Sequence, residues 1–345
     1  MTKPTLASLL LLSTLISGFS CQPTPKDQAI DWAQQFKLDS TQAQKDLEVL
    51  TAFPHPMGTP RQQEITRYIN QALTTKQISS HIQPFTAQTP NPLLLEQPQL
   101  PSPLTIEKSG ANIIGVVNPL KRNCVVAMGS HYDSKHLPNQ HSLGANDSGS
   151  STIALIQILQ YFNNLPHLSR LKCGLMGVFF DGEEAILPNW NDGIQRHPAK
   201  SIDNTYGSRF LVAKTKPCPG GRCLEMPQGN MRIVALVLID MIGHKNMKLS
   251  VDSHSHKGLI SLAKGFDLKL HNQPTFVKHT SPIEDDHIPF IKAGIPAIDL
   301  IDFNNISEWH TSRDTLEKLS MKSIEKSSRI AISLSLYLAI KGELP

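Results

Sequence analysis

The sequence has few of the features that mark nucleic-acid-binding or membrane-spanning proteins. Its 33 Lys and Arg barely exceed its 29 Asp and Glu, and no dense basic tract with interleaved aromatic residues occurs. Nucleic acid is therefore not an expected partner. No stretch reaches the roughly 18 consecutive apolar residues that a membrane-spanning helix needs. There is also no internal repeat, and 345 residues of ordinary composition favour one large globular domain.

Cysteine is scarce as well, with five residues in the chain, and the first of them ends an apparent export signal. Lys3 supplies a positive charge, residues 7–16 are mostly apolar, and residues 17–20 include small residues suited to cleavage. We therefore expect residues 1–21 to be a signal peptide and the protein to be exported, either periplasmic or secreted. Cys21 stands where a bacterial lipoprotein signal has its lipid-modified cysteine, so membrane attachment is expected only through a lipid at Cys21.

The rest of the chain alternates between predicted strands and predicted helices. We expect residues 22–38 to form an N-terminal tether and residues 39–345 to form one catalytic domain. Helices are expected to begin at Ser40 or Thr41 and at Thr59-Pro60, where a capping residue precedes proline. Five prolines make residues 89–103 a surface excursion. Further helices are predicted after Asp147, over 206–214, near 260, over 288–292 and over 321–340; strands are predicted over 78–85, 112–117, 124–128, 171–180, 233–239, 246–251 and 295–301.

This alternation predicts a single-domain α/β fold whose central sheet is mostly parallel and carries helices on both faces. In such sheets ligands bind beyond the carboxyl ends of the strands. Cys124 and Cys173 each begin a strand that ends in polar residues, so they would lie together at the opposite edge if the two strands are neighbours. Cys218 and Cys223 flank a short Pro-Gly-Gly-Arg loop. An exported protein meets an oxidising compartment, so we predict both disulfides.

Several of the predicted strands end in side chains that bind metals. The clearest case is the apolar run that ends at Phe180, after which come Asp181, Glu183 and Glu184. One glutamate there could bind a metal while its neighbour carries a proton. Imidazoles and carboxylates without thiolates are the ligands of catalytic zinc. In chain order, the candidate ligands and their neighbours are His131, Asp133, Asp147, Glu183, Glu184, Asp240 and His310.

Each of these residues has an ordinary structural explanation when it is taken alone. Asp147 could cap the helix that follows it, Asp240 could close a turn, and a lone histidine is more often hydrogen-bonded than metal-bound. The acidic residues after Phe180 could form a solvated turn. The metal hypothesis depends on all of them meeting at one edge of one sheet, which chance would rarely produce.

The order His-x-Asp, Asp, Glu-Glu, Asp, His resembles that of the zinc aminopeptidases with two neighbouring metal ions. Further motifs resemble the glutaminyl-peptide cyclotransferases of the animal type, and the resemblance runs from about residue 40 to the C-terminus. The motifs are HYDSK at 131–135, DGEEA at 181–185 followed by Trp190, YGSR at 206–209, EDDHIPF at 284–290 and EWHT at 308–311. One residue more than in the animal enzymes separates Glu184 from Trp190.

The resemblance implies an acyltransferase that converts the N-terminal glutamine of peptides or proteins to pyroglutamate and releases ammonia. It implies one zinc per chain and a proton shuttle. We also expect the protein to be a monomer. By this resemblance the zinc ligands are Asp147, Glu184 and His310; the catalytic residues are Glu183, Asp240 and Asp285; the substrate-binding residues are Trp309, Trp190 and Ile301; and His131 and Asp133 support the site without holding a second metal.

Two other functions remain open at this point. A two-zinc aminopeptidase of the same fold would use all five ligand types that the sequence retains. A non-catalytic exported binding protein would keep the fold alone, but such a protein has no chemical need for the intact Glu183-Glu184 pair.

Overall fold

The structure is a computed structural model that describes residues 23–93, 99, 105–117, 123–138, 141–166, 168–187, 204–227 and 229–344. The predicted signal peptide with Cys21, and Trp190, lie outside these ranges. Within them, no helix is long and apolar enough to cross a membrane. The helices are α1 (Pro25–Gln35), α2 (Ser40–Leu50), α3 (Pro60–Thr74), α5 (Ser151–Asn163), α6 (Tyr206–Ala213), α7 (Lys257–His271), α8 (His287–Lys292) and α9 (Met321–Lys341), with short helical turns η1 (Ala145–Ser150), η2 (Leu168–Arg170) and η4 (Leu316–Lys318).

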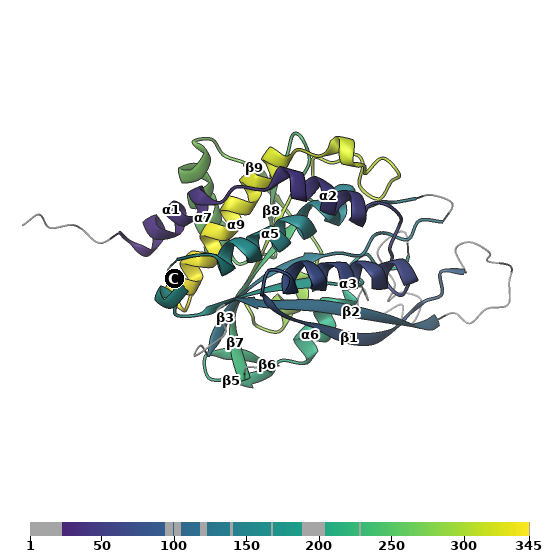
Figure 1. Cartoon of the computed structure of the whole chain (residues 1–345), viewed down its shortest axis with the longest axis horizontal. Helices are drawn as coiled ribbons and strands as arrows, with labels where there is room; N and C mark the ends of the chain where they lie inside the picture. The colour runs from purple at the N-terminus through teal and green to yellow at the C-terminus, as the bar shows by residue number, and fades with distance from the viewer. Residues whose placement is uncertain are drawn as a thin grey trace, which may run out of the picture.

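One eight-stranded sheet forms the centre of the molecule (Figure 1). Its strand order is β1-β2-β4-β3-β7-β6-β5, and β10 pairs with the second half of β7. A separate two-stranded sheet pairs β8 with β9. The strands are β1 (Ser79–Pro90), β2 (Thr105–Val117), β3 (Cys124–His131), β4 (Gly174–Phe180), β5 (Lys216–Cys218), β6 (Gly221–Met226), β7 (Gly229–Asp240), β8 (Leu249–Asp252), β9 (Phe276–Ser281) and β10 (Ala297–Ile301).

The prediction that the strands run parallel is correct for the centre of the sheet and wrong for its edges. Strands β4, β3, β7 and β10 run parallel, whereas β1 and β2 on one side and β6 and β5 on the other pair antiparallel. Apart from the start of β7, the four parallel strands are buried and nearly continuous in apolar residues, as expected for a sheet covered on both faces. The antiparallel strands β1, β5 and β6 are partly exposed to solvent, whereas the second half of β2, which pairs with β4, is buried.

Helices cover both faces of the sheet, as predicted. The larger core lies between one face and α1, α2, α3, α5, α7 and α9. The smaller core lies on the other face and includes Leu211 of α6 and Phe290 of α8. Figure 1 shows α5 and α9 above the central strands and α6 below them. These two layers hold the strands rigid, so that side chains at the strand ends have fixed positions.

Two expectations about the N-terminal region are corrected by the structure. Residues 25–35, expected to belong to a tether, form helix α1, which buries Ala29, Trp32 and Ala33. Thr24 and Asp27 form a reciprocal capping box that starts this helix, with proline at its first position. Helix α2 is capped by Asp39, whose side chain accepts from Gln42 N, and not by Ser40 or Thr41. Thr59 and Pro60 begin α3 as predicted.

Both predicted disulfides are confirmed. Strands β3 and β4 are parallel neighbours, and Cys124 at the start of β3 is bonded to Cys173 directly before β4. Cys218 and Cys223 close the short β5–β6 hairpin. The first bridge therefore lies at the sheet edge opposite to the candidate ligands.

Asp302 directly follows β10, and its burial is expected to make the stability of the protein depend on pH. Its side chain is fully buried, its Oδ2 accepts a hydrogen bond from Lys248 N at 3.0 Å, and burial raises its pKa to about 7. The folded state therefore keeps a proton on Asp302 that the unfolded state has lost above about pH 4. Because the folded state then binds more protons, this contribution to stability is present at low pH and is lost as the pH rises through 7.

We expect Asp302→Asn to remove this pH dependence, since the amide stays neutral. Between pH 5 and pH 8 the wild type should lose on the order of 2–4 kcal/mol of unfolding free energy more than the variant. Urea denaturation of both proteins at the two pH values measures the difference. Equal losses in the two proteins would show that Asp302 ionises normally in the folded state.

Candidate metal and active site

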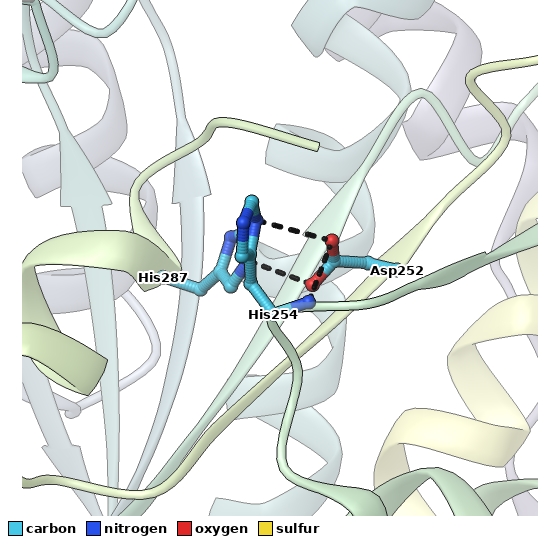
Figure 2. Close-up of side chains that lie close together, drawn as sticks. All are labelled: Asp252, His254 and His287. Atoms are coloured by element: carbon cyan, nitrogen blue, oxygen red, sulfur yellow. Dashed lines mark hydrogen bonds and ion pairs between the residues drawn. The ribbon is translucent and has the colours of Figure 1, made fainter. Parts of the chain in front are cut away.

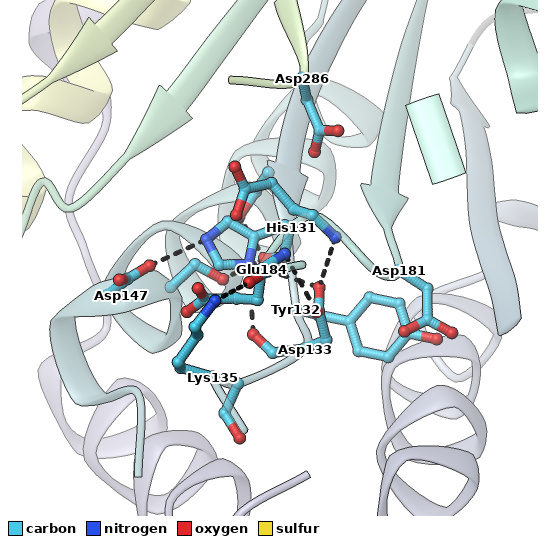
Figure 3. Close-up of polar contacts among 12 residues, drawn as sticks. His131, Tyr132, Asp133, Lys135, Asp147, Asp181, Glu184 and Asp286 are labelled. Carbon is cyan, nitrogen blue, oxygen red and sulfur yellow. Dashed lines mark hydrogen bonds and ion pairs between the residues drawn. The ribbon is translucent and has the colours of Figure 1, made fainter. Parts of the chain in front are cut away.

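The carboxyl ends of the parallel strands bring the predicted residues together, as the sequence suggested. His131 ends β3, Asp240 ends β7, and Glu183 and Glu184 follow β4 within four residues. Asp147 lies in the turn η1 before α5, and His310 lies in the loop after β10. Figure 3 shows His131, Asp147 and Glu184 converging from these separate elements. All of them are buried except His310, which is partly exposed.

Asp147, Glu184 and His310 form the first of two ligand groups. Their donor atoms lie within 4.8 Å of one another. His310 Nε2 lies 2.8 Å from Glu184 Oε2 and 3.6 Å from Asp147 Oδ2. Glu184 Oε1 is buried and has no hydrogen-bond partner among the described residues. A buried carboxylate oxygen without a partner is costly unless something else satisfies it, so this group fits a metal ion.

His131, Asp147 and Asp240 form the second group, and they also lie within 4.8 Å of one another. His131 Nε2 is 3.0 Å from Asp147 Oδ1 and 3.4 Å from Asp240 Oδ1. Asp147 thus belongs to both groups, with one oxygen facing each. The geometry brings together the ligand types of a two-metal site, and in both groups the histidine also forms direct ion pairs with the carboxylates.

Asp133 holds the two glutamates in place. Its Oδ1 accepts a hydrogen bond from Glu183 N at 3.1 Å, and its Oδ2 accepts from Glu184 N at 3.3 Å (Figure 3). The carboxylate therefore binds two consecutive backbone N–H groups of the turn that follows β4. These contacts fix the backbone from which both glutamate side chains project. Asp133 Oδ1 also lies 3.6 Å from His131 Nδ1, and Asp133 is not among the ligands.

Two further buried residues hold the ligands and were missed by the sequence analysis. Lys135 Nζ donates to the carbonyls of Glu184, Ala185 and Leu187, which fixes the chain after the second glutamate. Asp314 accepts from Asn146 N at 2.8 Å and from Asp147 N at 3.1 Å. Lys135 stands within the quoted HYDSK motif, which was a usable signal; Asp314 had none.

Asp181, the first carboxylate after β4, faces away from the ligand groups. Its Oδ2 accepts from Gln62 Nε2 at 2.6 Å and from Ala111 N at 2.8 Å. In Figure 3 it lies beside the ring of Tyr132, on the far side from Asp147. Asp181 therefore joins α3 and β2 to the end of β4, and only two of the three carboxylates in this turn belong to the site.

Within the YGSR motif, Gly207 is required because the backbone of α6 packs closely against neighbouring residues. A Cβ atom at this position would lie 2.3 Å from Asn112 Oδ1 and 2.5 Å from the carbonyl oxygen of Asp181. Any side chain there would push α6 away from the end of β4. The motif therefore fits the helix closely against the strand that carries the two glutamates.

A pocket of about 150 Å³ opens onto the ligand groups. This is about the volume in which protein cavities accept a benzene-sized guest. Trp309 stacks on the ring of His310 at 3.9 Å between centroids and packs edge-on against Phe303 at 5.1 Å. The walls of the pocket combine acidic residues with apolar ones. The predicted site residues that line the pocket are Asp147, Glu183, Asp240, Asp285, Ile301, Trp309 and His310. Residues that were not predicted also line it, including Met241, Ile283, Glu284 and Phe303.

The interior of the site carries an excess of carboxylates, which shifts their pKa values. Burial raises the pKa of Glu183 well above its ordinary value, and the neighbouring Asp285 and Glu184 raise it further, although His131 opposes the shift. Burial and then the charge of Asp240 raise the pKa of Asp285 in the same direction. Carboxyl groups with raised pKa values can both accept and return a proton near neutral pH.

The fold and the convergent carboxylates and imidazoles are those of a zinc aminopeptidase-like α/β protein. The chain belongs to peptidase family M28, whose pattern matches residues 112–335. It is 31% identical over 249 residues to a glutaminyl-peptide cyclotransferase of Boiga irregularis, covering 64% of this chain and 63% of the length of that relative.

Solved structures share the fold over nearly the whole chain. A glutaminyl cyclase of Macrostomum lignano has a TM-score of 0.65 and 22% identity and covers 94% of this chain and 95% of its own. A Zn-dependent exopeptidase of Parabacteroides distasonis has a TM-score of 0.68 and 20% identity, with coverage of 88% and 99%. The single-domain fold that the sequence predicted is thus confirmed.

Proposed function

We propose that this protein is a zinc-dependent glutaminyl-peptide cyclotransferase that acts on peptides or proteins with an N-terminal glutamine. The observation that carries the proposal is the small, partly apolar pocket that ends on Glu183 and on the group Asp147, Glu184 and His310. The curated relatives named glutaminyl-peptide cyclotransferase support the same activity.

The residues present suit a single zinc ion in the active site. Asp147, Glu184 and His310 supply two carboxylates and one imidazole, and the buried Glu184 Oε1 lacks another partner among the described residues. Zinc bound there supplies Lewis-acid polarisation of the substrate carbonyl and charge stabilisation for the oxyanion that develops on it.

Glu183 performs the proton transfer. The α-amine of the substrate attacks the side-chain amide carbon of the same glutamine, so that a C–N bond forms and closes the ring. Glu183 accepts a proton from the attacking amine and returns it to the side-chain amide nitrogen. This nitrogen leaves as ammonia when its original bond to the amide carbon breaks. The raised pKa of Glu183 matches this double role, because the carboxyl must both take and give the proton.

Asp240 and Asp285 orient and tune Glu183 from the pocket floor. Both line the same pocket as Glu183 and are buried, so the three carboxyl groups cannot all ionise comfortably. Sharing of protons among them keeps Glu183 available as a proton carrier. His131 compensates part of this charge through its contacts with Asp147 and Asp240.

The apolar walls protect the reaction from water. Ile301, Phe303 and Trp309 line the pocket, and Trp309 is held by stacking on His310. Water that reached the amide carbon would yield glutamate in place of the ring, so exclusion of water determines the product. Trp190 is proposed as a further wall and lies outside the described residues.

A two-zinc aminopeptidase is the second candidate, favoured by one specific observation. His131, Asp147 and Asp240 lie close enough to hold a second ion beside the first, with Asp147 shared. Such an enzyme would release a free N-terminal residue by hydrolysis.

The two candidates are separated by the mass of their products. We expect a peptide with N-terminal glutamine to lose about 17 mass units, the mass of ammonia, and a peptide with N-terminal leucine to remain intact, because only the glutamine side chain offers an internal amide carbon. Mass spectrometry after incubation with both peptides measures this. Release of free leucine or free glutamine would support the aminopeptidase instead.

The cellular setting belongs to the same proposal. Two disulfides suit an exported protein, periplasmic or secreted. We propose that the enzyme acts as a monomer, and that a lipid at Cys21 is its only means of membrane attachment.

A further inference from the structure

A second cavity of about 340 Å³ lies between α6 and α8, next to the active-site pocket. Residues within 204–213 and 284–293 line it, and we call it the α6–α8 groove. It is more than twice as large as the pocket, whose volume is about 150 Å³. Glu284 lines both cavities, so the groove and the pocket meet at this residue. No step of the proposed reaction uses the groove.

Buried contacts on either side of Glu284 fix its position at this junction. Asp252 Oδ1 accepts a hydrogen bond from Ile283 N at 2.9 Å, and Asp252 Oδ2 lies 3.0 Å from Nε2 of His287, the first residue of α8. Figure 2 shows the Asp252 carboxylate beside the ring of His287. Glu284 itself is exposed and forms no hydrogen bond or ion pair among the described residues. Its carboxylate is therefore available to a ligand that passes from the pocket into the groove.

The groove has the length and the surface that suit a short extended peptide. Apolar side chains of both helices line it, including Val212 and Ile288. Both helices begin beside the active site, because Tyr206 N donates to the carbonyl of Gly182 at 2.8 Å and α8 starts three residues after Glu284. Helix α8 has six residues, so its ends lie about 9 Å apart, which is the span of roughly three extended residues.

Two basic side chains give the groove a positive charge. Lys292 is the last residue of α8, is exposed, and forms no ion pair with a described residue. Arg209, the last residue of the YGSR motif, donates from Nε to the carbonyl of Asn204 at 2.8 Å, and its guanidinium lies 5.3 Å from the centre of the Tyr206 ring. Because Glu284 precedes α8 and Lys292 ends it, the carboxylate lies at the pocket and the ammonium group lies at the far end.

We propose that the α6–α8 groove binds the residues that follow the N-terminal glutamine of the substrate, and that its charges select peptides by the position of an acidic residue. This inference rests on the cyclotransferase activity proposed above, because the glutamine must occupy the pocket for the following residues to enter the groove. Glu284 faces the second residue of the peptide and disfavours an acidic side chain there. Lys292 and Arg209 favour an acidic side chain on the third or fourth residue.

The selection acts on binding and not on the chemical step. The groove lies away from the reacting atoms, so it holds the substrate and the transition state equally, and its effect appears in KM. Each exposed ion pair changes an affinity by roughly 1.4- to 5-fold, and salt screens it.

The test compares three pentapeptide amides that begin with glutamine and contain one glutamate and three alanines, with the glutamate second, third or fourth. All three have the same net charge, so the attraction of the whole protein for an acidic peptide is the same for each. The peptide with glutamate second should have the lowest kcat/KM, and the better of the other two should exceed it about threefold to tenfold at low salt. The difference should lie in KM and shrink at high salt.

Two variants assign this preference to the groove. Lys292→Ala should lower kcat/KM for the peptides with glutamate third or fourth, and Glu284→Gln should raise it for the peptide with glutamate second, so each brings the ratio closer to one. Lys269→Ala is the matched control, because Lys269 is exposed in the last turn of α7 and does not line the groove, and it should keep the wild-type ratio.

Glutamine amide, which has no second residue, separates failure of this inference from failure of the proposed function. Release of ammonia from glutamine amide, with equal kcat/KM for the three peptides or with an unchanged ratio in Lys292→Ala, would overturn the groove alone. No release of ammonia from glutamine amide or from any of the peptides would overturn the cyclotransferase activity, and the groove with it.

Discussion

Replacing Glu183 by glutamine is expected to yield a folded protein that keeps its active-site zinc but forms pyroglutamate at least roughly a hundredfold more slowly. The amide has nearly the shape of the carboxyl group and leaves Asp147, Glu184 and His310 intact. It cannot carry a proton, however, and general acid–base catalysis typically contributes about 10²–10⁴-fold. Steady-state kinetics with a glutamine peptide should show the loss mainly in kcat, because binding does not require the proton transfer.

Glu184→Gln should fail in a different way, although the two residues are neighbours. It removes an anionic ligand, so zinc content is expected to fall by one equivalent together with activity. Elemental analysis and kinetics on the same samples distinguish the two variants. Asp133→Asn is the control for disturbance of the turn. Asp133 accepts from the backbone N–H groups of both glutamates and lies 3.6 Å from His131 Nδ1 without being a zinc ligand, so its replacement should cause a milder loss.

Either of two results would contradict these roles. Near-normal turnover in Glu183→Gln would show that another group moves the proton. Loss of zinc from Glu183→Gln, with zinc retained in Glu184→Gln, would mean that the two glutamates have exchanged roles.

Removing the disulfide between Cys124 and Cys173 is expected to cost about 4 kcal/mol of unfolding free energy. The two residues are 49 positions apart, so the bridge restricts a large loop of the unfolded chain. Alanine is the suitable replacement, because both cysteines are buried among apolar residues and serine would bury a hydroxyl group. Denaturant titration of the double alanine variant measures the loss.

The bridge between Cys218 and Cys223 provides the matched control. Its separation of five residues closes a short loop, for which the same relation gives about 2 kcal/mol. Zinc content should stay unchanged in both double variants. The bridge between Cys124 and Cys173 lies at the start of strands that are roughly 25 Å long, and the ligands lie at the other end of these strands. A larger cost for the short loop would show that native contacts, and not chain entropy, dominate the effect.

The parts of the fold that follow from local patterns were predictable from the sequence. The pattern of apolar runs that end in polar residues correctly predicted the positions of His131, Glu184 and Asp240 at or just after strand ends. The pair Thr59-Pro60 correctly predicted the start of α3. Helix α1 was missed because its polar composition hides three apolar residues that the rest of the fold buries. Such a helix forms because tertiary packing stabilises it, and its helix propensity alone does not predict it.

The geometry of the parts of the site that lie in loops is set by distant contacts, so the sequence can name such residues without predicting how they are placed. His310 has a left-handed backbone with φ of 53°, as do Ala185 and Met241 beside it in the site, and nothing in the local sequence calls for this conformation. Asp314 acts through the backbone of a residue that is 167 positions away.

The shared ligand Asp147 and its partner His310 lie far apart in the sequence, with β4, β7 and β10 of the central sheet between them. The ligands come together only when the elements between these two residues are folded, so ion binding and folding are thermodynamically linked. An ion that binds only the folded state adds about 4 kcal/mol when its concentration is 1,000 times its dissociation constant. Zinc starvation would therefore shorten the lifetime of this protein in the presence of proteases, beyond its effect on turnover.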